Sequence, residues 1–422
     1  MARFAMDLSP LRSSRDFRLM FWARIIALLG ISLTLVGLSV QVYQISGSSL
    51  VVAMVNAAAG GTLLVGTLVG GVLADRYERR KLLVFSRGGA GVVFAILTLN
   101  ALLDEPMLWL VFVCAAVIGM VDGVAETALV AVTPNLVRPD QLAAAGALTA
   151  ITTQLATMVG PTVGGLIISG PGVALCYGIT TVATIIQVTM MARITPRPPA
   201  EKEHDHPIRA MAEGWSFVRR SQIIAGLLLV DLFGALFALP YAVFPEMAEK
   251  SLFGDPRIVG MLYSAPAVGA FIGALFSGWV GRFKFPGYAL TGAGVVWGLG
   301  MLGFGLSTQL PIALVFLGLA GVGLIFSDIL QRALLQSHTP DRLMGRVSSY
   351  WLLQATVGPA VGGAFAGTLA TFGGARFAVI TGGILCVVCV LVIPLVLPEF
   401  RRATLVSPDG PQETEQATAK VD

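Results

Sequence analysis

Apolar runs long enough to cross a bilayer alternate with short polar connections along the whole chain. A membrane-spanning helix needs about 20 consecutive apolar residues, and each run has roughly that length. The runs are continuously apolar, which is typical of helices and not of the alternating strands of membrane barrels. A helix also satisfies its own backbone hydrogen bonds in lipid. We therefore predict an all-α polytopic membrane protein with twelve transmembrane helices. The predicted spans are Leu19–Tyr43, Leu50–Ala74, Leu82–Leu103, Leu108–Val132, Leu142–Ile168, Val173–Ile194, Ile223–Phe244, Ile258–Gly281, Tyr288–Leu306, Pro311–Leu335, Val347–Leu369 and Phe377–Leu397.

The composition agrees with this pattern. Apolar residues make up 55% of the 422 residues and charged residues 12%, and the mean hydropathy is +0.81. A soluble protein carries about twice that charged fraction, so the mass of the chain lies in membrane helices. The pI is near 9.0. The positive charges are spread over short loops, however, and so reflect orientation rather than nucleic-acid binding.

The distribution of Lys and Arg predicts the orientation. If the N-terminus is cytoplasmic, the outer loops hold only Lys250, Arg257 and Arg376, and Arg24 lies within the first span. All other Lys and Arg residues then fall on the inner side, which marks that side as cytoplasmic. We expect both termini to lie in the cytoplasm of a bacterial inner-membrane protein. Met1–Arg18 is basic and polar, and the span after it is long enough to stay in the membrane, so we expect no cleaved signal.

The longest polar connection, Thr195–Gln222, divides the spans into two sets of six. Three short segments of the first set return in the second set in the same order. They are Val65–Gly71 with Ile272–Gly278, Pro139–Leu142 with Pro340–Leu343, and Val159–Gly165 with Val357–Gly363. Each pair joins spans of the same orientation, so we predict a parallel 6+6 repeat of the kind that transporter halves show. The predicted domains are an N-terminal six-helix bundle at residues 1–194, a cytoplasmic linker at 195–222, a C-terminal six-helix bundle at 223–397 and a cytoplasmic tail at 398–422.

A charged turn, Gly70–Lys81 with the sequence GGVLADRYERRK, connects the second and third spans. Its glycines favour close approach of helix backbones, and its charges keep the turn in water. The segment resembles the loop between helices 2 and 3 of the major facilitator superfamily, written G-x-L-A-D-R-x-G-R-R, with Glu78 in place of a glycine. The matching residues are Gly71, Leu73, Ala74, Asp75, Arg76, Arg79 and Arg80. The resemblance implies a gating loop in which Asp75 caps a helix N-terminus of the other half in one conformation.

The fifth span contains the motif Gly160-Pro161-x-x-Gly164-Gly165. Proline removes one helical hydrogen bond and bends the helix, while the glycines let a neighbouring helix pack against the bend. The motif resembles the fifth-helix signature of export-type members of the superfamily, which implies a hinge and an antiporter. Its twin at Gly358–Gly363 leaves ordinary close packing as an alternative.

Ionisable residues inside predicted spans are candidates for a proton or cation site, because each costs roughly 2.5–3.5 kcal/mol at mid-helix. Asp122 and Glu126 lie one turn apart in the fourth span, and Asp231 lies deep in the seventh. A structural hydrogen bond for the two aspartates and an interfacial position for Glu126 are the alternatives. Arg24 is a candidate anion contact, or it snorkels to the interface.

Two further patterns concern charges near the inner side. Asp328 and Arg332 have the i, i+4 spacing of a salt bridge in the tenth span. The fourth span holds no arginine, whereas superfamily members that exchange protons often have one there. We expect no cofactor and no metal site, because His204 and His206 lie in a charged linker and Cys386 lies in an apolar span, where it packs.

Further segments resemble bacterial enterobactin exporters: FRLMFWARIIALLG, VGGVLADRYERRK, the VDG of the fourth span, VTPNLVRPDQLAAAGALT and LLQSHTPDRLMGRV. The resemblance spans Phe17–Leu397 and implies export of a siderophore by alternating access, around a cavity formed mainly by spans 1, 4, 7 and 10. The sequence has no G-x-x-x-x-G-K-[ST] loop, so an ion gradient, most simply of protons, is the expected energy source. Export of other amphiphilic drugs or metabolites, an importer and a transport-inactive membrane receptor stay open. We expect a monomer in the lipid bilayer that binds a small-molecule substrate and no nucleic acid.

Overall fold

The computed structural model describes residues 7–132, 136–195, 216–252, 254–278 and 283–404. Within these residues every regular element is helical, which confirms the all-α prediction. The elements are α1 (Ser9–Ser13), α2 (Arg15–Ser46), α3 (Ser49–Arg76), α4 (Arg79–Ala101), α5 (Leu108–Val132), η2 (Pro139–Gln141), α6 (Leu142–Ser169), α7 (Val173–Ala192), α9 (Gln222–Phe237), η3 (Tyr241–Val243), α10 (Phe244–Ser251), α11 (Pro256–Leu275), α12 (Pro286–Leu306), α13 (Leu310–His338), α14 (Asp341–Val396) and α15 (Pro398–Arg401).

Eleven helices in the described part of the chain are long and apolar enough to cross a membrane. The last of them, α14, contains both of the final two predicted spans. Gly374 lies inside α14 with a φ of 78°, a left-handed conformation that a glycine adopts without strain and that interrupts the helix. Two spans joined at this break would give a total of twelve. That total stays a prediction.

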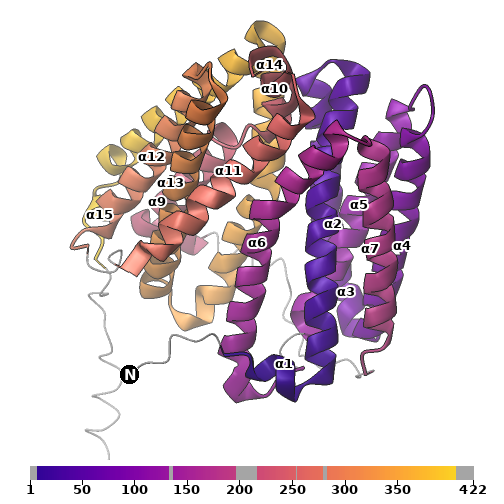
Figure 1. The fold of residues 1–422 in the computed structure, drawn as a ribbon. Helices are drawn as coiled ribbons and strands as arrows, with labels where there is room; N and C mark the ends of the chain where they lie inside the picture. The colour runs from indigo at the N-terminus through magenta and orange to yellow at the C-terminus, as the bar shows by residue number, and fades with distance from the viewer. Residues whose placement is uncertain (1–6, 133–135, 196–215, 253, 279–282, 405–422) are drawn as a thin grey trace, which may run out of the picture.

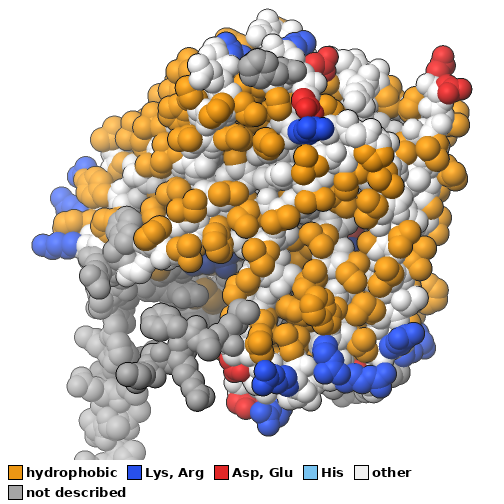
Figure 2. Space-filling view, viewed as in Figure 1, with side chains coloured by type: hydrophobic (Ala, Val, Ile, Leu, Met, Phe, Trp, Pro, Cys, Tyr) orange, Lys and Arg blue, Asp and Glu red, His pale blue; other side chains and the backbone are white. Residues whose placement is uncertain are grey.

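The helices form two groups that meet along the middle of the molecule (Figure 1). Helices α2 to α7 lie on one side and α9 to α14 on the other, and the groups touch where α6 meets α11 and where α3 meets α14. We call the end at which α1 lies the α1 end and the opposite end, at α10, the α10 end. In Figure 2, hydrophobic side chains cover the middle of the visible face, and Lys and Arg side chains gather mainly towards the α1 end.

Two predicted spans differ clearly from the structure. The eighth, Ile258–Gly281, ends early, because α11 stops at Leu275, and the seventh is interrupted. The run Ile223–Phe244 is not a single helix, because α9 ends at Phe237 and a short turn around Pro240 leads into η3 and then into α10. Proline disfavours helical geometry at the residue before it, which accounts for the break. Of the predicted linker, residues 196–215 lie outside the described residues, and with them His204 and His206.

Glycines allow unusually close contact between helices within each group. A Cβ atom at Gly66 of α3 would collide with the backbone of Met120 on α5, and one at Gly119 of α5 would collide with Ala59 on α3. In the second group, Gly269 of α11 meets the backbone of Gly318 on α13 in the same manner. Lipid tails are as apolar as leucine, so close van der Waals packing of this kind holds membrane helices together. The matching contacts are consistent with the predicted repeat, which stays a prediction.

The paired glycines of α3 give a test of this packing. A Gly66→Ala substitution is expected to destabilise the protein by about 1–3 kcal/mol, because the added methyl group must push α5 away. Gly71 is the matched control, since a Cβ atom there would meet nothing within 4 Å. Thermal unfolding of the detergent-solubilised variants measures the difference. Equal melting temperatures for Gly66→Ala and Gly71→Ala would contradict this account of the contact.

Candidate functional site

A cavity of about 320 Å³ lies between the two groups of helices. Its volume is at the lower end of the range of about 300–1,000 Å³ that small-molecule sites occupy. Most of its lining is apolar, and the polar groups are few. They come from both groups of helices: Thr34, Asn56, Asp122, Tyr241 and Thr356.

The elements around the cavity differ in part from those expected. Helices α2 and α5, the first and fourth predicted spans, contribute as expected. Helices α3 and α14 and the η3 turn supply the remaining lining apart from Phe94 of α4, and no described residue of α9 or α13 takes part. The η3 turn lies within the predicted seventh span, Ile223–Phe244, so that span also contributes, through Tyr241 and Ala242, whereas no described residue of the tenth span does. Helices α3 and α14, which touch each other across the middle of the molecule, line the cavity in addition.

Three charged side chains meet at the edge of this cavity. Arg87 on α4 places Nη1 2.6 Å from Oδ1 of Asp122 and Nη2 3.2 Å from Oε1 of Glu126. The exposed fraction of the side chain is 6% for Arg87, 17% for Asp122 and 46% for Glu126. Asp122 and Glu126 lie one turn apart on α5, so one guanidinium group reaches both. The candidate acids of the fourth span therefore form one cluster around a buried arginine.

The sequence analysis did not single out Arg87. In the distribution of Lys and Arg between the two sides of the membrane, this residue was counted with the preceding loop. Its signal was available, because Arg87 lies six residues beyond Lys81 and inside the predicted third span. An arginine at that depth needs a buried acidic partner. The fourth span itself holds no arginine, and the arginine that pairs with its two acids comes from the neighbouring helix α4. With all three groups ionised the cluster carries a net charge of −1, and a single proton makes it neutral.

Asp231 belongs to a second polar cluster, in the other group of helices. Its exposed fraction is 8%, and its carboxylate lies near the side chain of Gln331 on α13, which stabilises the charged form, and near Asp328, which repels it. Gln331 also donates to Ser327 through Nε2, at 2.9 Å, and its Oε1 accepts from the indole of Trp351, at 3.2 Å. A single glutamine therefore links the α9 acid to α13 and α14.

The predicted salt bridge between Asp328 and Arg332 is not among the ion pairs of the described residues. The guanidinium of Arg332 instead lies over the indole ring of Trp351, 4.7 Å from the ring centroid. A cation over an aromatic face is stabilised by the ring quadrupole, and Arg favours this stacking because it is planar. Sequence spacing alone does not distinguish the two partners.

Arg24 lies on α2, seven residues before Ile31, so both occupy the same face of the helix. Ile31 lines the central cavity. The Nε atom of Arg24 is buried and has no hydrogen-bond partner within the part of the chain that the structure describes. The side chain is therefore neither fully solvated nor paired with an acid there.

The gating-loop residues form a shorter turn than expected, because α3 continues to Arg76 and α4 begins at Arg79. Arg76 is exposed, and the side chain of Asp75 lies outside the described residues. Arg80 pairs with Glu78 at 3.2 Å and donates to the carbonyl oxygens of Ala192 and Ile194, each at 3.2 Å. These contacts tie the turn to the end of α7, since cations stabilise helix C-termini. Gly71 makes no close helix contact, unlike Gly66 and Gly70.

The hinge motif lies in the interior of α6, which is helical on both sides of Pro161. A Cβ atom at Gly160 would collide with Ser32 of α2, and Gly164 lies in ordinary contact with Leu33 of the same helix. Gly165 faces the other way: a Cβ atom there would be 3.1 Å from Gly260 of α11. The motif thus packs α6 against its own group and against the opposite group at the same level.

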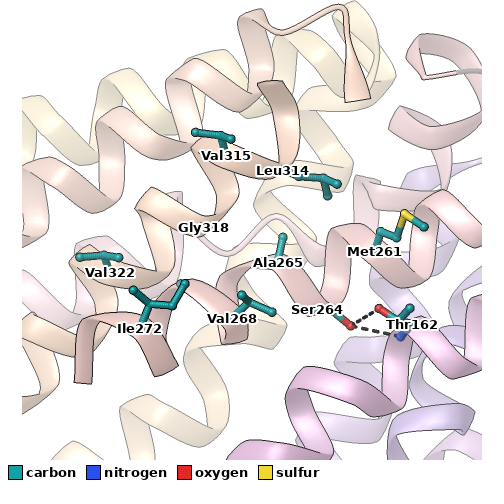
Figure 3. A pocket seen from close by; sticks show the side chains of 11 residues that line it. Thr162, Met261, Ser264, Ala265, Val268, Ile272, Leu314, Val315, Gly318 and Val322 are labelled. Carbon is teal, nitrogen blue, oxygen red and sulfur yellow. Dashed lines mark hydrogen bonds between the residues drawn. The ribbon is translucent and has the colours of Figure 1, made fainter. Parts of the chain in front are cut away.

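A second cavity, of about 490 Å³, lies along α11 and α13 (Figure 3). The side chains drawn around it are almost all aliphatic, with Thr162 and Ser264 hydrogen-bonded at one end. Val315 is 70% exposed and Ile272 is 47% exposed. The lining of this groove shares no residue with that of the central cavity, so the groove is not part of the candidate site.

The arginine cluster gives a test that needs no substrate. An Arg87→Met substitution is expected to destabilise the protein by about 3–5 kcal/mol, because it leaves two carboxylates without their partner. A second substitution, Asp122→Asn in the same chain, is expected to recover part of the loss. Thermal unfolding in detergent measures both. An Arg87→Met variant that unfolds at the same temperature as the parent would show that the cluster contributes nothing to stability.

Comparison with known proteins places these features in a family. The enterobactin exporter EntS of Shigella boydii serotype 4 (strain Sb227) is 35% identical over 403 residues, which cover 94% of this chain and 95% of the relative. The protein of the same name from Escherichia coli O6:K15:H31 (strain 536 / UPEC) is 35% identical over the same length. The likeness extends over both groups of helices, as the sequence motifs indicated.

Solved structures share the fold at low sequence identity. A POT family transporter in complex with 5-aminolevulinic acid superposes with a TM-score of 0.71 at 12% identity, covering 92% of this chain and 97% of that one. A bacterial homolog of the human lysosomal transporter Spinster, inward-facing and unoccupied, gives a TM-score of 0.69 at 13% identity, covering 94% of this chain and 100% of that one. The profile of one family, described as transmembrane secretion effectors, matches residues 5–420. The chain belongs to this family of transporters in the major facilitator superfamily.

Proposed function

We propose that the protein exports a siderophore, enterobactin or a similar catecholate, from the cytoplasm across the bacterial inner membrane by alternating access. The observation that carries the proposal is the 35% identity to enterobactin exporters over 94% of the chain. A cavity between the two groups of helices, with few polar groups in an apolar lining, suits an amphiphilic molecule of this type. The predicted domains, the cytoplasmic termini and the monomeric state belong to the same proposal.

Proton coupling is the second part of the proposal. Asp122 and Glu126 share one arginine, so a proton on either carboxylate changes the net charge of the cluster from −1 to 0. Asp122 also lines the central cavity, so the proton site and the cargo site adjoin. Charged groups inside a membrane are costly and usually serve transport. Asp231, buried beside Gln331, is the corresponding acid of the second group, and Arg24 is the candidate contact for an anionic cargo.

Two motifs carry the proposed conformational change. The gating loop, with Gly71, Asp75, Arg76, Arg79 and Arg80, would dock on the opposite group when the α1 end closes. In the described structure the contacts of Arg80 are with Glu78 and the end of α7, within its own group. Close glycine packing of α6 against α2 and α11 supports the second motif, Gly160–Gly165, as the point about which the groups move.

A second candidate function is efflux of other amphiphilic drugs or metabolites. The observation that favours it is the small number of polar groups in the cavity lining, since apolar pockets discriminate weakly between ligands of similar size. A transport-inactive receptor on the same scaffold is the remaining alternative.

Secretion measurements separate these functions. A siderophore-producing strain without its own exporter is expected to release more catecholate chelator when it expresses this chain, measured in the medium by chromatography. Release of a lipophilic dye without release of the chelator would favour the second function. Movement of neither molecule would contradict transport altogether.

Transport into inverted vesicles tests the residues. In vesicles that take up the siderophore when a pH gradient is applied, Asp231→Asn is expected to reduce uptake to background, because the carboxyl can no longer cycle between two charge states. Asp75→Asn is expected to impair uptake while the protein still inserts. Asp104→Asn, in an exposed turn, is the matched control and should transport normally. Full pH-driven uptake by Asp231→Asn would show that Asp231 has a structural role and does not couple transport to protons.

A further inference from the structure

Glu246 on α10 is a buried carboxylate that sequence reasoning placed in a loop and did not consider. Its exposed fraction is 5%, and three donors surround it. Ser49 donates through its hydroxyl to Oε2, the backbone N–H of Ala375 donates to Oε1 at 3.3 Å, and Lys250 reaches Oε1 at 3.1 Å. A carboxylate this deeply buried is stable only when its lone pairs are satisfied, so these contacts account for its position.

The three donors come from different parts of the fold. Ser49 begins α3, in the first group of helices. Ala375 follows Gly374, the residue at which α14 is interrupted, and Lys250 lies one turn further along α10. The interruption of α14 therefore presents an N–H group to Glu246. One carboxylate thus joins the first group to two elements of the second group.

Other contacts between the groups lie on the same side. Ser39 of α2 donates to the hydroxyl of Tyr263 on α11 at 2.9 Å, and that hydroxyl donates to the carbonyl of Tyr241. Arg257, at the start of α11, donates to Ser169, at the end of α6, at 2.8 Å. Gly367 of α14 packs directly on Ala53 of α3. These contacts run from the middle of the molecule to the α10 end.

Glu246 differs from the other contacts in being charged and buried. Neutral pairs such as Ser39 with Tyr263 exchange their partners for water at little cost when helices separate. Losing a hydrogen bond to a buried ionised group costs more, because hydrogen bonds to charged groups are stronger than neutral ones, although Lys250 and the N–H of Ala375 remain as partners of Glu246. Breaking the bond between Ser49 and Glu246 therefore costs more than breaking the neutral contacts at this end, so this bond opposes separation of the two groups most strongly.

We propose that Glu246 is the latch of the α10 end: its bond to Ser49 holds the two groups of helices together while the cavity is closed on that side, and it must break for cargo to leave there. Glu246 is a positioning residue, since it does not line the cavity. The inference rests on the alternating access of the proposed function, and it does not depend on which cargo is carried.

Cysteine labelling tests the latch without any cargo. The four native cysteines are replaced, and one reporter is introduced by Ile31→Cys, at the cavity. A membrane-impermeant maleimide is added on the α10 side. That side is identified as the vesicle face from which a cysteine at Leu103, in the exposed turn between α4 and α5, reacts.

The reporter is expected to react at least about tenfold faster from the α10 side when Glu246→Ala or Ser49→Ala is added, because loss of a charged hydrogen bond shifts the equilibrium by that order. Glu246→Gln is expected to lie between these variants and the parent, since the amide still accepts a hydrogen bond but has no charge. Glu249→Ala, an exposed acid on the same helix, is the matched control and should leave the rate unchanged.

Melting temperatures show whether each variant is folded. If Glu246→Ala does not fold, Ser49→Ala and Glu246→Gln decide the question. Labelling rates within twofold of the parent for the folded variants would overturn the latch. If those rates rise while the secretion assay detects no siderophore, the latch stands and only the proposed cargo is wrong.

Discussion

The absence of water inside the bilayer is the constraint on which the rest of this structure depends. A buried charge is stabilised there by partners within the protein, and Arg87 has two of them, Asp122 and Glu126. Apolar clusters lie on both sides of this level in the first group of helices. One includes Phe17 and Leu83 and the other Leu97 and Val111. Packed hydrocarbon therefore lies on both sides of the charged cluster, while Asp122 faces the cavity and Glu126 is half exposed, so a change in protonation acts directly on how α4 and α5 interact.

The two contacts between the groups of helices use different chemistry. Where α6 meets α11, Gly165 and Gly260 place two backbones in direct contact, and Thr162 is hydrogen-bonded to Ser264 beside them. Polar side chains dominate towards the α10 end, where Ser49, Glu246 and Tyr263 take part. Backbone contact between glycines tolerates small rotations, because no side chain has to change its rotamer. Directional hydrogen bonds are more restrictive. They occur in both contacts, but only towards the α10 end does one of them involve a buried carboxylate, that of Glu246.

Sequence reasoning recovered what depends on local pattern. Continuous apolar runs predicted the helices. The motif around Asp75 and the resemblance along the whole chain indicated the family. Sequence patterns do not predict how each helix is rotated about its own axis relative to its neighbours, and this rotation determines which side chains interact. Arg332 was therefore paired with Asp328 by spacing, although it lies over Trp351. Glu246 was overlooked for a related reason: its partners Ser49 and Ala375 are distant in sequence, and no periodicity connects them.

The repeated motifs show that equal sequence in the two halves does not mean equal position in the mechanism. In the first half, Gly160 and Gly165 of the VGPTVGG motif bring α6 against both α2 and α11. In the second half, Gly358 and Gly362 of VGPAVGG pack on Ala235 of α9, within their own group. The second motif also contributes Pro359 and Gly363 to the cavity lining, whereas no described residue of α6 lines it. Ala360 of the second motif also touches Gly60 of α3, where α3 meets α14. Both motifs therefore contribute to the contact between the groups, but only the second also shapes the cavity.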